Sequence, residues 1–173
     1  MMFSYRHAIS LSVVASSLAF ITAPARADDV ISADWGFSAA FPCQAQIKTK
    51  PINTDAGNVT MVYYICQNGG SGYYVALGDY PKGFVISPDE TLASAAQGAA
   101  QNVNGTIRSM VPYPIGNIPG RELLVDVTSS SAVAHVRIFV VGDRLYQVGV
   151  LGRTGSERSQ AWLDFLNSFT LRH

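Results

Sequence analysis

The sequence contains few charged residues, few histidines and only two cysteines. Asp, Glu, Lys and Arg make up 14% of the 173 residues, and 12 basic side chains balance 12 acidic ones. This balance excludes the basic footprint that binding to nucleic acid or to an anionic membrane surface requires. With three histidines and no C-x-x-C pair, the spacing typical of metal ligands is also missing. We therefore expect no metal, no cofactor and no nucleic-acid partner.

Long hydrophobic runs are also missing, apart from one near the N-terminus. Residues 8–22 form an apolar segment with several serines, which is short for a membrane-spanning helix. A weakly basic stretch precedes it at residues 6–7, and an A-x-A cleavage site follows at residues 25–27. We predict a signal peptide at residues 1–27 and a single domain at residues 28–173. An uncleaved N-terminal anchor is the alternative.

Cleavage after Ala27 predicts a periplasmic or secreted protein of the bacterial envelope, without a stable membrane anchor. The next residue is Asp28, whereas a lipoprotein would have a cysteine there. The remaining length is that of one ordinary domain and suffices to bury a hydrophobic core. The low charged fraction, together with an aromatic content of 10%, excludes a disordered chain.

Cys43 and Cys66 are predicted to form a disulfide bond. An even number of cysteines in an oxidising compartment usually indicates a bridge. If the first strand continues past Pro42, Cys43 shares a face with Phe41, while Cys66 shares a face of the next strand with Tyr64. The alternative is a redox-active or metal-binding pair, but no C-x-x-C motif or nearby histidine supports it.

The most strongly β-prone segment, residues 136–151, predicts a hairpin in the core. Its halves are separated at residues 142–143 by Gly-Asp, a two-residue turn in which glycine supplies a positive φ. Pairing across this turn sets Phe139 opposite Tyr146. Because both faces of the hairpin are mostly apolar, we expect two central strands that are covered on both sides.

Two helices are predicted. The first has Ser87 as N-cap and Pro88 at its first position, carries a stripe of small apolar residues, and ends before Asn104. The second follows a capping-box pattern at residues 154–157. Its apolar side chains have the i, i+3, i+4, i+7 spacing of a helix and are expected in the core with Phe139 and Tyr146: Trp162, Phe165, Leu166 and Phe169.

The remaining segments predict an α+β fold. Residues 48–58 contain Lys-Pro and Ala-Gly-Asn breakers and are expected to form a loop. Strands joined by short turns predict a single, mainly antiparallel β-sheet of about seven strands covered by two helices, like an α/β/α sandwich. Besides the hairpin, the expected strands are residues 35–41, 59–67, 73–80, 106–111 and 121–128.

Five short motifs span almost the whole of the predicted domain. They are G-F-x-x-x-F-P at 36–42, Y-x-V-x-x-x-D-x-P at 73–81, P-G-R-E at 119–122, R-x-x-x-V-G-x-R-L-Y-Q at 137–147 and F-L-x-S-F-x-L at 165–171. In this order they resemble a group of small exported bacterial proteins whose fold is similar to the PsbP-like α/β/α sandwich. The resemblance implies that fold and a scaffold or binding role, and it supplies no catalytic residues. The cysteine pair departs from the pattern of the group.

Candidates for catalysis are few. His135 is the only histidine inside the predicted domain apart from the terminal residue, and Asp126 and the serines at residues 129–131 precede it. A hydrolase-like enzyme using His135 with a nearby Ser and Asp is therefore the alternative function. Geometry defines such a triad, and the G-x-S-x-G motif of many hydrolases is missing. We predict that the protein is not an enzyme.

Tyrosines are the feature that most favours a binding role. A tyrosine offers apolar area with a polar tip, which suits recognition surfaces. We predict a binding surface that includes Tyr74, Tyr80, Tyr113 and Ile115, the last two in a loop pre-organised by prolines. The predicted function is that of a non-enzymatic binding or accessory protein for a protein or small ligand in the cell envelope. Docking on an envelope protein complex is a further alternative.

The predicted signal peptide can be tested directly. Because cleavage is expected after Ala27, the intact mass of the exported chain should correspond to residues 28–173. A chain that retains Met1 and sediments with membranes would contradict this prediction.

Overall fold

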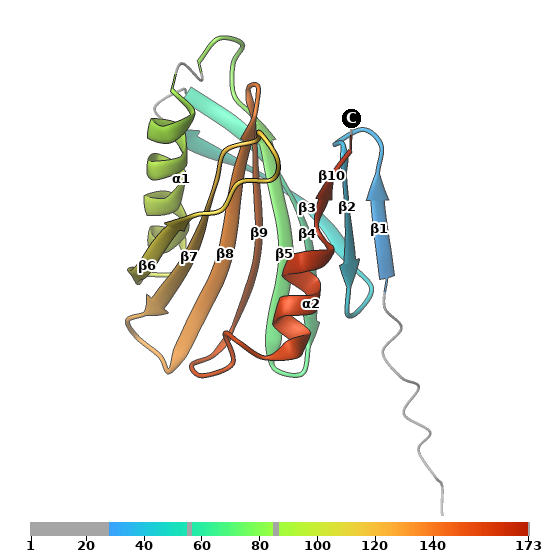
Figure 1. Cartoon of the computed structure of the whole chain (residues 1–173), viewed down its shortest axis with the longest axis vertical. Helices are drawn as coiled ribbons and strands as arrows, with labels where there is room; N and C mark the ends of the chain where they lie inside the picture. Colours follow the sequence, from blue (N-terminus) through green and yellow to red (C-terminus); the bar gives the residue numbers. More distant parts are fainter. Residues whose placement is uncertain (1–27, 55–56, 85–86, 173) are drawn as a thin grey trace, which may run out of the picture.

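The structure, a computed structural model, describes residues 28–54, 57–84 and 87–172. The predicted signal peptide, residues 1–27, lies outside the described residues and stays a prediction. Within the described part, the chain forms an α+β fold of ten strands and two helices (Figure 1).

A seven-stranded antiparallel sheet forms the centre of the fold. Its strands are β3 (Gln46–Thr54), β4 (Gly57–Asn68), β5 (Ser71–Asp79), β6 (Gly105–Pro112), β7 (Gly120–Val127), β8 (Ala132–Val141) and β9 (Arg144–Arg153). They are arranged in the order β3-β4-β5-β9-β8-β7-β6. The predicted mainly antiparallel sheet is therefore confirmed, and the β8–β9 hairpin lies inside it.

A second, smaller sheet corrects the prediction of a single sheet. Its strands, in the order β1-β2-β10, are β1 (Asp28–Ser32), β2 (Phe37–Phe41) and β10 (Thr170–Leu171). The prediction placed the segment containing β2 in the main sheet. Instead, every second residue of β2 is buried against the face of the large sheet, with Phe37 and Phe41 fully covered. Because β2 packs on the face of the large sheet, its hydrogen-bonded partners are β1 and β10 and not strands of the large sheet.

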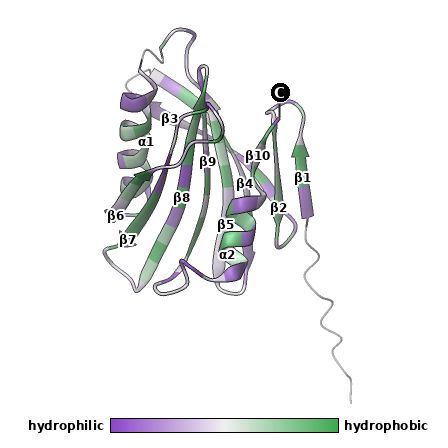
Figure 2. Cartoon of the chain, viewed as in Figure 1, coloured by the Kyte–Doolittle hydropathy of each residue, from purple (hydrophilic) through white to green (hydrophobic). Residues whose placement is uncertain are grey.

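The two helices contact different parts of the large sheet. Helix α1 (Pro88–Asn102) packs against β6, β7 and β8, whereas α2 (Gln160–Ser168) contacts β2 and β9. Figure 1 shows α2 and the small sheet together on the side of the large sheet away from α1. Figure 2 shows hydrophilic and hydrophobic positions around both helices, as expected when one side of each packs on a sheet.

The β8–β9 hairpin has the predicted register. Phe139 lies opposite Tyr146, and Gly142 in the turn has a φ of 58°. Successive side chains alternate between the two faces, and those of both strands are mostly buried on either side. Val136 and Ile138 pack under α1, whereas Phe139 belongs to the opposite, aromatic face.

An aromatic cluster fills the face of the sheet opposite α1. The ring of Phe169 stacks on that of Phe139 at 5.7 Å and on that of Phe37 at 5.9 Å, so β2 and the hairpin meet around it. The indole nitrogen of Trp162 donates a hydrogen bond to Ser71 Oγ at 3.1 Å. The six residues predicted for the core are all buried, which confirms the prediction: Phe139, Tyr146, Trp162, Phe165, Leu166 and Phe169.

Helix α1 forms as its local signals predict. The Ser87 side chain accepts a hydrogen bond from the Glu90 backbone N–H, Pro88 occupies the first turn, and Asn104 beyond the helix has a φ of 49°. Alanines, together with Leu92, form the buried stripe. Small side chains let the helix axis approach the sheet closely, so α1 fits tightly over β6–β8.

The loop predicted at residues 48–58 is wrong, because most of this segment is β-strand. Strand β3 pairs antiparallel with β4 from Gln46 to Thr54, and Pro51 lies opposite Thr60. Proline cannot donate a ladder hydrogen bond, but an edge strand tolerates it where its nitrogen would face away from the partner. β3 is the edge of the sheet, so the proline that predicted a loop is compatible with a strand.

The capping box predicted at residues 154–157 is also wrong. Helix α2 begins at Gln160 with Ser159 as N-cap, and no side chain caps its first turn. The Glu157 carboxylate instead accepts a hydrogen bond from the Gly155 N–H at 2.6 Å and pairs with Arg108 of β6. The acidic residue therefore stabilises a turn and a distant ion pair, which its spacing alone does not reveal.

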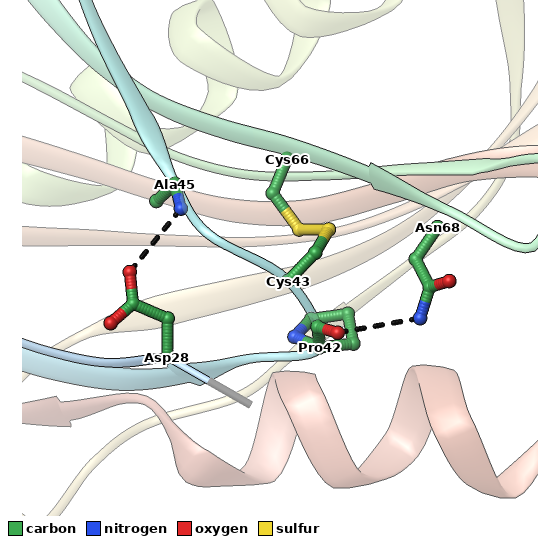
Figure 3. The surroundings of a disulfide bond; sticks show 6 residues. All are labelled: Asp28, Pro42, Cys43, Ala45, Cys66 and Asn68. Atoms are coloured by element: carbon green, nitrogen blue, oxygen red, sulfur yellow. Dashed lines mark hydrogen bonds between the residues drawn. A yellow bond between two sulfur atoms is a disulfide. The ribbon is translucent and has the colours of Figure 1, made fainter. Parts of the chain in front are cut away.

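The predicted disulfide between Cys43 and Cys66 is present (Figure 3). Cys43 follows β2 and Cys66 lies in β4, with 5.8 Å between their Cα atoms. Two hydrogen bonds lie beside the bridge: the Ala45 N–H donates to Asp28, and the Asn68 amide donates to the Pro42 carbonyl oxygen. The bridge therefore joins the small sheet to the large one.

Removing this bridge should destabilise the domain. Replacing Cys43 and Cys66 by alanine should lower the free energy of unfolding by roughly 2–4 kcal/mol, because the unfolded chain regains the freedom of the closed loop. Chemical denaturation of both forms measures the difference. Peptide mapping without reductant should find the two cysteines crosslinked in the exported protein. Two free thiols there would contradict the assignment.

Candidate functional site

A cleft opens on the face of the large sheet that carries α1. Because α1 packs against β6, β7 and β8, it leaves the same face of β9, β5, β4 and β3 without a helix above it. The cleft between the flank of α1 and these strands has a volume of about 760 Å³. Small-molecule sites typically measure roughly 300–1,000 Å³, so the cleft has the size of a ligand site.

The sheet wall of the cleft consists of alternate residues of neighbouring strands. On β4, every second side chain faces the cleft, from Met61 to Gln67, with Tyr63 and Ile65 between them. β9 contributes Leu145, Gln147 and Leu151, and β5 contributes Tyr74. This wall is apolar and aromatic, with a few neutral amides.

Two glycines make room for large side chains on this wall. The Tyr74 ring covers Gly149 in the neighbouring strand, where an added Cβ would lie 2.6 Å from ring atoms. Met61 covers Gly78 in the same way, with its sulfur 2.5 Å from the position of an added Cβ. Tyr74 thereby forms an aromatic platform across β9, and a side chain at position 149 would displace it.

Burial reinforces the neutral form of two cleft tyrosines, Tyr63 and Tyr74. Burial, and to a smaller extent the neighbouring Tyr63, raises the pKa of Tyr74 above its ordinary value. Burial also raises the pKa of Tyr63. Both phenols therefore stay protonated at physiological pH and offer neutral hydroxyl groups.

The helix wall is formed by one stripe of α1. Ser94, Gln97, Gly98 and Gln101 line the cleft at i, i+3, i+4 and i+7. A Cβ added at Gly98 would meet no atom within 4 Å, so the space beside this residue is open. This wall is thus smooth at its centre and neutral and polar along its length.

The described residues that line the cleft include no Asp, Glu, Lys, Arg or His. The sequence itself contains none of these residue types from Thr91 to Ile107, although surface helices usually carry charges on their exposed face. Across the described chain, no hydrogen bond is made by the side chains of four cleft residues: Gln67, Gln97, Gln101 and Gln147. The cleft therefore offers neutral hydrogen-bonding groups beside apolar surface.

The structure separates the four residues of the predicted binding surface. Tyr74 and Tyr80 line the cleft, and the Tyr80 ring stacks on Phe84 at 5.5 Å. Tyr113 and Ile115 lie on the opposite face of the sheet, half-buried against the aromatic cluster. The Arg137 guanidinium lies 4.1 Å from the centre of the Tyr113 ring. Tyr113 thus already has an intramolecular role.

Several cleft residues were not predicted from sequence. Tyr63, Gln67 and Gln147 resemble ordinary strand residues, and Gly98 resembles a weak point in a helix. The signal that the sequence does contain is the long uncharged stretch of α1, which is unusual for a helix at the surface. This uncharged stretch can be interpreted as one wall of a cleft only when the position of the sheet wall opposite it is known.

A charged cluster surrounds His135 on the aromatic face of the sheet. Its Nδ1 lies 3.0 Å from the Glu157 carbonyl oxygen, and its Nε2 lies 3.0 Å from the Glu122 carboxylate. Arg137 donates from Nε to the same Glu122 oxygen at 2.8 Å and from its terminal nitrogen to Asn167 at 2.9 Å. These contacts connect β7 and β8 to α2 and to the turn that precedes it.

This cluster does not have the arrangement of a Ser-His-Asp triad. One ring nitrogen of His135 contacts Glu157 and the other contacts Glu122. Asp126 is paired with Arg108. A catalytic histidine needs one nitrogen directed at the nucleophile. His135 and Asp126, two of the residues of the hydrolase alternative, are therefore engaged in structural contacts.

The acidic residues of this region are held in the charged form. Burial raises the pKa of Glu122, but hydrogen bonds from Arg137 and His135 outweigh it and leave the pKa below its ordinary value of 4.5. The hydrogen bond from Arg108 lowers the pKa of Asp126, and it also lowers that of Glu157. All three carboxylates therefore favour the folded state near neutral pH.

Among residues 28–54, 57–84 and 87–172, no group of three His, Cys, Asp or Glu side chains could hold a metal ion. Neither described helix has the length and hydrophobicity of a membrane-spanning segment.

No protein-family model matches the sequence, and a comparison with curated proteins found no match.

Neutralising Glu122 should weaken the charged cluster. Glu122→Gln should lower the free energy of unfolding at pH 7 by about 1–3 kcal/mol, because two hydrogen bonds lose their charge. Since the folded-state pKa of Glu122 is lowered, its contribution is complete above pH 4.5 and is lost as the pH falls below that value.

Urea unfolding between pH 7 and pH 3 tests this prediction. The wild-type stability should fall more steeply in acid than that of Glu122→Gln. The exposed residue Glu90 supplies a matched control, since Glu90→Gln should retain the wild-type slope. Equal slopes for Glu122→Gln and the wild type would contradict the assignment.

Proposed function

We propose that the chain is an exported, non-enzymatic binding protein of the bacterial envelope that takes a small ligand in the cleft between α1 and strands β3, β4, β5 and β9. The observation that carries the proposal is the cleft itself, with its volume of about 760 Å³ and its uncharged lining. Pockets of this size with apolar walls and a few polar groups are the usual form of small-molecule sites.

The rest of the molecule supports binding over catalysis. Catalysis generally needs at least two convergent polar groups with tuned protonation beside a pocket. The charged side chains around His135 instead pair with one another on the face away from the cleft. Among the described residues, those lining the cleft contain no ordinary general base or metal ligand.

The proposed location rests on the disulfide and the predicted signal peptide. A disulfide that joins two sheets is typical of proteins in an oxidising compartment such as the periplasm. The resemblance to the PsbP-like group, with its α/β/α layering, fits α1 on one side of the sheet and α2 on the other. We propose that the chain has this layered fold and is related to that group.

Blocking the cleft tests the proposed function. Gly98→Leu would direct a side chain into the open space beside α1, where an added Cβ meets no neighbouring atom. The variant should fold at least as well as the wild type, because glycine inside a helix costs about 1 kcal/mol relative to good helix formers. A loss of binding would then not result from unfolding.

The full-length chain should be exported from bacterial cells, purified without denaturant and extracted with organic solvent. Mass spectrometry should detect a small molecule retained by the wild type and by His135→Ala but reduced in Gly98→Leu. No retained molecule in the wild type, or equal retention in Gly98→Leu, would contradict binding in the cleft. Loss of retention in His135→Ala alone would favour a site on the opposite face.

A further inference from the structure

We infer that the cleft selects a flat, uncharged ring compound with hydrogen-bonding atoms at its edge, an inference that rests on the proposed binding function. The two walls of the cleft differ in a way that suggests this class. One wall carries the Tyr74 platform and Tyr63, and the other is the smooth centre of the α1 stripe at Gly98.

Charge excludes one large group of ligands. A charged group that loses its water must find an opposite charge or several strong hydrogen bonds, and otherwise its transfer is strongly unfavourable. The described residues of the cleft supply no ionised side chain, and Tyr63 and Tyr74 are neutral phenols. Carboxylates, phosphates and ammonium groups would therefore be left without a partner, so a neutral ligand fits best.

The shape of the sheet wall favours a flat ligand. The Tyr74 ring lies over Gly149, so its face can contact a second ring in an offset stack. On the helix side, Ala95, Gly98 and Ala99 present little side chain and leave room for a planar group. A ring that contacts both walls would bury apolar surface on its two faces.

The amides of the cleft indicate which groups the edge of the ligand carries. Gln147 lies half-buried on the central strand β9, and among the described residues its side chain has no hydrogen-bond partner. Gln67 from β4 and Gln101 from α1 bring further amides to the same cleft. Each amide both donates and accepts, so the ligand can carry carbonyl, hydroxyl or N–H groups at its rim. A plain hydrocarbon would offer no hydrogen-bonding partner to the half-buried amide of Gln147.

Two fluorescent probes with the same rings test the charge selection. N-phenyl-1-naphthylamine is neutral, and 8-anilinonaphthalene-1-sulfonate is the same compound with a sulfonate group. Both should be titrated against the exported chain, against Gly98→Leu and against Gly98→Ala as the matched control. Urea unfolding of each variant confirms that it is folded. Only the part of the signal that Gly98→Leu removes reports on the cleft.

The neutral probe should bind in the cleft at least about tenfold more tightly than the sulfonate. Gly98→Leu should weaken its binding by a similar factor, and Gly98→Ala should change it little. If both probes bind equally and both respond to Gly98→Leu, the charge selection is wrong while the binding function stands. If neither probe responds to Gly98→Leu, the cleft is not the site and the proposed function fails with it.

A competition experiment tests the flat shape. 2-Naphthol and 1-decanol have the same number of carbon atoms and one hydroxyl group each, but the first is planar and the second is a flexible chain. 2-Naphthol should displace the neutral probe from the wild type at lower concentration, although decanol is the more hydrophobic compound. More effective displacement by decanol would overturn the ring ligand in favour of an acyl chain.

Discussion

The β8–β9 hairpin has apolar side chains on both faces, and the rest of the fold depends on covering them. On one face, Phe139 and Tyr146 meet the rings of Phe169 and its neighbours, which α2 and the small sheet supply. On the other face, Val136 and Ile138 lie under α1. The disulfide links the small sheet to β4 and so holds it against the aromatic face of the large sheet.

The two faces are covered to different extents, and this difference creates the cleft. The aromatic face is filled from β4 to β8, whereas α1 covers only β6–β8 of the opposite face. Glycines at positions 78 and 149 leave room for Met61 and Tyr74 over the strands without a helix. The result is an apolar floor with neutral amides around it and no charge among the described residues that line it. Binding of a neutral small molecule is the function that we propose for this surface.

Patterns confined to one short segment predicted the fold best. The turn at Gly142 set the hairpin register, Ser87 and Pro88 marked the start of α1, and the cysteine pair indicated the bridge. Local patterns gave wrong predictions where a residue type is compatible with two structures. Pro51 suggested a loop but lies in an edge strand, and Glu157 suggested a helix cap but pairs with a distant arginine. The cleft was not predictable in full, because its walls come from β4, β9 and α1. Of the four residues predicted for binding, two lie in it and two pack on the other face.

The location of ligand binding is the central claim, and NMR of aromatic and backbone signals tests it most directly. On addition of N-phenyl-1-naphthylamine, the ring signals of Tyr63 and Tyr74 and the amide signal of Gly98 should shift together in proportion to bound probe. The ring signals of Tyr113 and Phe139, on the opposite face, should stay unchanged. Shifts confined to Tyr113 and its neighbours, with Tyr74 unaffected, would contradict the account.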